Sequence, residues 1–121
     1  MSLNSVLEQL REFPVIPIVR TSTPELAATA IEWLSEAGLR TFEITMTTPG
    51  AVDLMTQYAS REDILVGAGT VTSKDQAKRC LDAGARFIVS PCIVKQLPEI
   101  SHQWGAPVSY THLTLPTTPY E

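Results

Sequence analysis

The feature that most constrains the fold is a regular repeat of short apolar segments. Four residues that are expected to close strands follow one another at steps of 23, 24 and 23 (43−20, 67−43, 90−67): Arg20, Glu43, Gly67 and Ser90. Amphipathic segments with helical spacing separate these strands. Strict alternation predicts an α/β fold with parallel strands and right-handed crossovers. A (β/α)8 barrel and a doubly wound sheet both fit, and the even steps favour the barrel.

The predicted elements are short. A helix is expected over residues 2–13, and strands over 15–19, 41–45, 64–69 and 86–91, with a fifth strand beginning at 106–108. The run 15–19 is apolar and β-branched, as in a strand buried on both faces. Thr23 with Pro24 and then Thr48 with Pro49 predict the starts of two helices, and Thr72 or Ser73 predicts a third. Pro98 is expected to interrupt the last helical segment.

Composition and charge narrow the function classes. Hydrophobic residues make up 44% of the chain, the net charge is −4 and the pI is about 5.1. An acidic balance argues against non-specific binding to nucleic acid or to anionic membranes. We find no signal peptide and no apolar run of the roughly 20 residues that span a membrane. These features predict a soluble cytoplasmic protein whose cysteines, Cys80 and Cys92, are reduced.

Glu43 and Arg20 are candidate functional residues, because ligands of such folds bind at the carboxyl ends of the strands. Glu43 interrupts an apolar strand and alternates with Phe42 and Ile44, so it faces the other side of the sheet. Desolvation would raise its pKa, as suits a general acid/base. A structural carboxylate paired with a cation is the alternative. Arg20 can bind a carboxylate or phosphate, or it can be an ordinary loop arginine.

The segment "VGAGTV" resembles a phosphate-binding loop but lacks the third glycine of the dinucleotide fingerprint, since Thr72 stands there. Gly67 and Gly69 are expected to allow close approach of a ligand or of the barrel interior. Thr70 then offers a hydroxyl and an amide at the strand end.

Together, "PVIPIVR", "FEITMTTPGA", "VGAGTV" and "FIVSPCI" resemble the aldolases of 2-keto-3-deoxy-6-phosphogluconate and of 4-hydroxy-2-oxoglutarate, over about residues 15–107. The resemblance implies a homotrimeric (β/α)8 barrel that needs no metal and no cofactor. It also implies a Schiff-base lysine and release of pyruvate plus an aldehyde from a keto-acid substrate. Glu43 matches the family's general acid/base, and Thr70, Pro91 and Arg20 match substrate-binding positions.

The chain departs from this family pattern in two ways. Thr47 stands where many members carry an arginine that contacts the anionic groups of the substrate. The Schiff-base lysine belongs to a motif like "FKFFPA" on the sixth strand, and this chain has no such motif. Lys74, Lys78 and Lys95 lie in other contexts, so none of them receives the role.

The last segment of the chain follows neither the apolar strand pattern nor the amphipathic helix pattern. Residues 108–117, "VSYTHLTLPT", resemble the translation of the end of a transposon-based sequencing adapter. We therefore expect residues 1–107 to be the first half of the barrel domain, about four βα units preceded by a short helix. Residues 108–121 are expected to be non-native read-through.

These observations predict that the parent enzyme is a carbon–carbon lyase and that this chain alone is inactive. The keto-acid substrate is the only partner expected besides the other subunits. Another phosphate-sugar barrel enzyme, an isomerase or epimerase, and a non-catalytic fragment are the alternatives.

Overall fold

The computed structural model describes residues 2–91, 94 and 96–110 of the 121-residue chain. The predictions for Cys92, for Lys95 and for most of the tail, residues 111–121, therefore lie outside the described residues.

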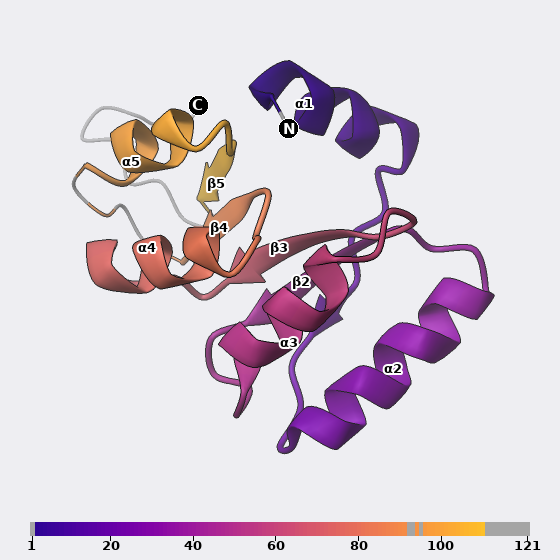
Figure 1. The fold of residues 1–121 in the computed structure, drawn as a ribbon. Coiled ribbons are helices and arrows are strands. Elements are labelled where there is room, and N and C mark those ends of the chain that lie inside the picture. Colours follow the sequence, from indigo (N-terminus) through magenta and orange to yellow (C-terminus); the bar gives the residue numbers. More distant parts are fainter. Residues whose placement is uncertain (1, 92–93, 95, 111–121) are drawn as a thin grey trace, which may run out of the picture.

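Five parallel strands form one sheet (Figure 1). They are β1 (Ile18–Val19), β2 (Thr41–Thr45), β3 (Leu65–Gly69), β4 (Ile88–Ser90) and β5 (Val108–Tyr110). Each strand pairs with the next strand in the sequence, in the order β1-β2-β3-β4-β5. A doubly wound sheet reverses its strand order at one point. The described strands show no such reversal, so they follow the order of a barrel.

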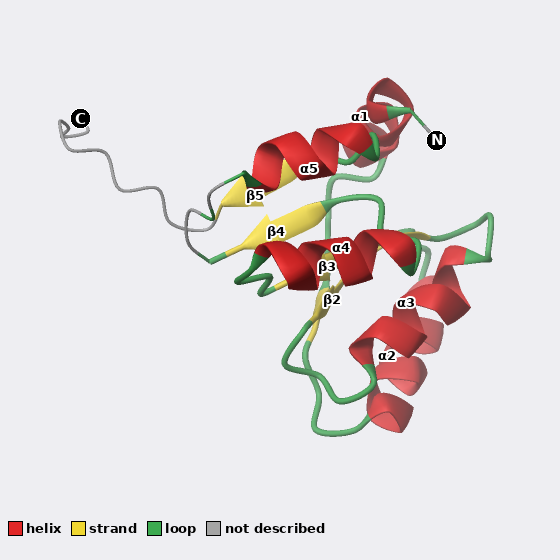
Figure 2. Cartoon of the chain, turned by 60° about the vertical axis from the view of Figure 1, so that its left-hand side comes forward, coloured by secondary structure: helices red, strands yellow, loops and turns green. Residues whose placement is uncertain are grey.

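The helices lie on both sides of the sheet, but unequally (Figures 1 and 2). The helices are α1 (Leu3–Glu12), α2 (Pro24–Glu36), α3 (Ala51–Ala59), α4 (Lys74–Asp82) and α5 (Leu97–Gln103). Helices α2 to α5 pack on the outer face, where Phe42, Ile44 and Ala68 belong to the main core. Helix α1 packs on the inner face, where its Val6 contacts Leu65 and Phe87. The predicted order of one helix followed by four βα units is confirmed.

Two helix starts follow the predicted caps. The Thr23 hydroxyl accepts a hydrogen bond from Leu26 N at 3.1 Å, and Pro24 is the first residue of α2. Ser73 caps α4, because its hydroxyl accepts from Gln76 N at 3.1 Å. Such caps satisfy amides that have no partner within the helix.

The first strand is shorter and more exposed than predicted. Its pairing is confined to Ile18 and Val19, and the Ile18 side chain is 63% exposed. Pro17 has no N–H to donate and contributes only its carbonyl, which accepts from Glu43 N at 3.0 Å. The prediction of a strand over 15–19 buried on both faces is therefore wrong, since most of the inner face of β1 is uncovered.

Two other local predictions are also wrong. Helix α3 begins after Gly50, which adopts a left-handed φ of 72°, and not at Thr48 with Pro49. Pro98 lies in the first turn of α5, where the missing N–H costs nothing, and so it does not interrupt that helix.

Glu43 and Gly67 do not close their strands. They pair with each other in the middle of β2 and β3, two residues before each strand ends. The repeat of 23 to 24 residues therefore marks equivalent strand regions rather than strand ends.

Candidate active site

Four of the predicted site residues lie where strands end. Arg20 directly follows β1, Thr70 directly follows β3 and Pro91 directly follows β4, while Thr47 comes two residues after β2. Because all strands are parallel, their carboxyl ends share one edge of the sheet. The fifth residue, Glu43, lies in the middle of β2, two residues before the end of that strand.

Glu43 is a nearly buried carboxylate whose pKa is influenced by the cation of Arg20. It is 7% exposed and points to the face opposite Phe42 and Ile44, as the alternation predicts. Burial raises the pKa of Glu43, and the positive charge of Arg20 partly offsets this rise. A carboxyl with a raised pKa holds its proton more readily than an ordinary glutamate and can both release and take up a proton.

Arg20 and Thr70 contact each other across the strand between them. Arg20 Nη2 donates a hydrogen bond to Thr70 Oγ1 at 3.1 Å. Thr70 has a φ of 55°, and only one other non-glycine residue in the described part of the chain has a positive φ. This conformation costs energy in a β-branched residue and is typical of functional sites. Arg20, Glu43 and Thr70 therefore form one group.

Two glycines make room for this group and for the inner core. A Cβ on Gly69 would collide with the Glu43 carboxylate, and a Cβ on Gly67 would collide with the Phe87 ring. The close approach predicted for both glycines is confirmed. The approaching groups are side chains of the chain itself.

A cluster of threonine hydroxyls at the end of β2 was missed by the sequence reasoning. Thr45 Oγ1 lies 2.9 Å from Thr47 Oγ1 and 3.2 Å from Thr48 Oγ1. Thr48 also contacts the backbone of the loop before α2. The run "TMTT" was the available signal, because threonines clustered at a strand end often bond to nearby loops. Thr47 thus belongs to a polar network, whereas Pro91 shares the edge without joining it.

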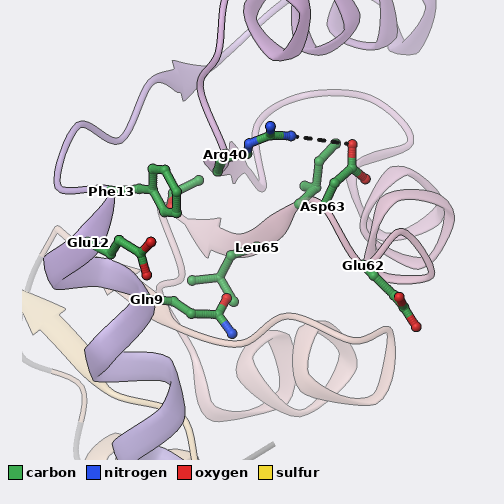
Figure 3. A pocket seen from close by; sticks show the side chains of 9 residues that line it. Gln9, Glu12, Phe13, Arg40, Glu62, Asp63 and Leu65 are labelled. Atoms are coloured by element: carbon green, nitrogen blue, oxygen red, sulfur yellow. Dashed lines mark ion pairs between the residues drawn. The ribbon is translucent and has the colours of Figure 1, made fainter.

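The inner face below Glu43 contains an apolar cavity of about 400 Å³. Glu43 lies in its wall, together with α1 and the β4–β5 region. A separate cavity of about 280 Å³ lies at the opposite end, where β2 and β3 begin, with Gln9, Phe13 and the Arg40–Asp63 ion pair in its wall (Figure 3). The predicted site residues are absent from the wall of this second cavity.

The lysines and the cysteine of the described region lie on α4. Lys74 and Lys78 are exposed, and Lys74 Nζ donates a hydrogen bond to Gln96 Oε1 at 3.4 Å. Cys80 is an unpaired, buried thiol whose pKa is raised to about 11 by burial. Among the described residues, no cluster of three or more His, Cys, Asp or Glu is arranged to hold a metal ion. No helix in that part of the chain is long and apolar enough to cross a membrane.

The order of the parallel strands and the polar residues at their carboxyl ends define an α/β barrel-type protein. Comparison with known sequences identifies the group of proteins concerned: the KDPG and KHG aldolase family matches residues 6–110. A 2-dehydro-3-deoxy-phosphogluconate aldolase of Haemophilus influenzae is 27% identical over 105 residues, which cover 86% of this chain and 50% of that protein.

Solved structures agree with the sequence comparison. The 2-keto-3-deoxy-6-phospho-gluconate aldolase of Zymomonas mobilis superposes with a TM-score of 0.72 at 28% identity, over 91% of this chain and 52% of that one. The KDPG aldolase of Legionella pneumophila, solved with pyruvate captured as a covalent carbinolamine, gives a TM-score of 0.65 at 32% identity over 78% and 47%.

The chain therefore belongs to the KDPG and KHG aldolase family, whose members are carbon–carbon lyases. Its fold is part of a TIM-barrel-type fold, as predicted. It spans about half the length of the relatives it matches.

Proposed function

We propose that the whole protein, of which this chain is the first half, is a class I aldolase. It cleaves 2-keto-3-deoxy-6-phosphogluconate or 4-hydroxy-2-oxoglutarate to pyruvate and an aldehyde. The observation that carries this proposal is the nearly buried Glu43 beside the Arg20–Thr70 pair, in a chain of this family. The carbinolamine captured in the Legionella relative supports a Schiff-base route.

The proposed chemistry needs one amine and one proton carrier. A lysine amine from the second half attacks the keto carbon and water leaves, which gives an iminium. Glu43 takes the proton of the substrate hydroxyl, the carbon–carbon bond breaks, and the electron pair moves toward the iminium nitrogen. The aldehyde departs, Glu43 returns the proton to the enamine carbon, and water releases pyruvate. The raised pKa of Glu43 suits both proton transfers.

The remaining site residues are proposed to bind the substrate. Arg20 holds an anionic group by charge-assisted hydrogen bonds, and Thr70 holds the pyruvate-derived end. Pro91 lines the site. Thr47 places an uncharged hydroxyl where many relatives carry a cation, and Arg20 supplies some of the charge for the substrate's anionic groups.

The complete protein is proposed to work without metal or cofactor, as a homotrimer in the cytoplasm. The 121-residue chain, which contains no lysine in the matching motif, is proposed to be inactive. Residues 108–121 are proposed to be read-through from an adapter. The described strand β5 at 108–110 is compatible with this origin, because any residue other than proline can supply the main-chain groups that pair with β4.

Borohydride trapping with pyruvate tests the activity. Reduction should fix pyruvate on a lysine of the complete protein and leave the 121-residue chain unmodified. An adduct on the short chain would contradict its proposed inactivity. The absence of an adduct on the complete protein would contradict the aldolase assignment.

The DNA that encodes residues 108–121 and the region beyond them provides a second test. Codons that differ from the adapter would contradict read-through. A native continuation without a lysine in the "FKFFPA" context would favour an isomerase or epimerase instead.

A further inference from the structure

Thr48 is a buried residue that joins the end of β2 to the loop before α2. It is 2% exposed, although its neighbour Thr47 is exposed. Its hydroxyl accepts a hydrogen bond from Thr21 N at 3.3 Å and donates one to Val19 O at 3.4 Å. Val19 and Thr21 are the two chain neighbours of Arg20. One side chain from the turn after β2 therefore holds the backbone on both sides of Arg20.

The hydrogen-bonding capacity of threonine fixes the direction of this network. A hydroxyl has one proton and two lone pairs. Because Val19 O can only accept, the Thr48 proton points to it, and Thr45 must donate to Thr48 across 3.2 Å. Thr47 then donates to Thr45 across 2.9 Å. Thr48 thus uses its proton and both lone pairs, and only another hydroxyl residue can replace it.

Arg20 depends on this support because its own side chain is exposed. A long, exposed side chain samples many rotamers unless its backbone and its partners restrict it. Arg20 nevertheless has to reach Thr70, 50 residues further along the chain, and remain close enough to Glu43 to act on its charge. The position of the Arg20 backbone decides whether both are possible.

We propose that Thr48 is a positioning residue of the site, which holds the loop on both sides of Arg20 and so keeps the guanidinium beside Glu43 and Thr70. This role rests on the proposed function. Thr48 itself touches no reacting atom and acts through Arg20. The same bonds explain why Thr48 does not cap α3, since its hydroxyl is already fully used.

The experiment is an NMR titration of the Glu43 carboxyl in the 121-residue chain. Arg20 lowers the pKa of Glu43, so Thr48→Val should release Arg20 and move the Glu43 midpoint upward. Thr48→Ser should restore the wild-type midpoint. Thr41→Val is the matched control, since Thr41 is a second buried threonine, at the start of β2, and its hydroxyl has no partner among the described residues.

Three outcomes would overturn the proposal. In the first, Thr48→Val lowers the free energy of unfolding but leaves the Glu43 midpoint unchanged, which would show a purely structural role. In the second, Thr48→Val shifts the midpoint equally when Arg20 is already replaced by Gln, which would show an effect that bypasses Arg20. The third needs no variant: the Thr21 amide of the wild-type chain exchanges with solvent as fast as an unprotected peptide. We expect that exchange to be slowed roughly tenfold or more.

None of these measurements needs turnover. Failure of pyruvate trapping in the complete protein would remove the aldolase function and leave these results standing. An unchanged Glu43 midpoint in Thr48→Val would reject only the positioning role of Thr48 and would leave the aldolase function standing.

Discussion

The Glu43 carboxylate occupies a position that is unfavourable for a charge. It is nearly buried in a parallel strand, and among the described residues Arg20 is the one charged group that lowers its pKa. Burying an ionised carboxylate costs free energy unless bonds or charges compensate. The Glu43 carboxylate is therefore expected to reduce the stability of the fold, while it serves the proposed proton transfers.

Glu43→Gln should stabilise the chain relative to wild type at neutral pH but not in acid. An acid whose pKa is raised by folding stabilises the fold below its unfolded pKa, and this contribution is lost as the pH rises through the folded value. Glutamine does not titrate. The two chains should therefore match at about pH 3, and the variant should be more stable by about 0.5–2 kcal/mol at about pH 8.

Urea unfolding at both pH values measures the difference. The other carboxylates are shared by both chains, so their titration cancels. An equal difference at both pH values would contradict a raised pKa for Glu43.

Gly69 is predicted to be intolerant of a side chain because of Glu43. A Cβ at Gly69 would collide with the Glu43 carboxylate, so Gly69→Ala should destabilise the chain by about 1–3 kcal/mol. The matched control is Gly69→Ala in a Glu43→Ala background, where the colliding group is gone. Denaturant unfolding of the four chains gives the coupling energy, and additive losses would show that the collision does not occur.

Among the elements, α2 shows how local signals alone can define a helix. Its N-cap and first proline follow the sequence pattern closely, and α2 contributes Ala27 and Ile31 to the core. Helix α3 shows the opposite case. Its local Thr-Pro signal failed, because Thr48 bonds to the loop before α2 and leaves Gly50 at the helix start. A cap can be predicted only when its side chain has no stronger partner elsewhere.

Thr23→Ala should destabilise the chain by about 1 kcal/mol, because the Leu26 amide loses its partner. Thr29→Ala is the control on the same helix. Thr29 is exposed and, in the part of the chain that the structure describes, its hydroxyl bonds only to Glu25 O, so alanine there should be neutral or slightly stabilising. Thermal or urea unfolding compares the two variants, and equal losses would contradict the capping role.

At the scale of the whole molecule, the sheet is open where a barrel would be closed. β1 and β5 are its two edge strands, and Ile18 on the inner face is 63% exposed. Unpaired strand edges and exposed apolar side chains promote association between chains.

The isolated chain should self-associate through the inner face and these edges. Ile18→Lys should reduce the association measured by sedimentation at increasing concentration, because lysine on an edge strand opposes pairing. Trp33→Lys is the control, since Trp33 is 69% exposed but lies on the outer helix α2. If the Trp33 variant dissociates as much as the Ile18 variant, the inner face is not the contact.

The sequence by itself determined the elements and the side of β2 on which Glu43 lies. Strand and helix periods are local, and alternation along β2 separates Glu43 from Phe42 and Ile44 without knowledge of the rest. The motifs near the strand ends were also sufficient to indicate the family.

Only the tertiary structure decided which of those residues meet. The Arg20–Thr70 bond joins residues 50 apart in the sequence, and the Thr21–Thr48 bond joins residues 27 apart. Such contacts depend on the register of neighbouring strands and on the paths of two loops, which no local period encodes. The exposure of Ile18 has the same origin, because burial depends on what covers a face and not on the strand that presents it.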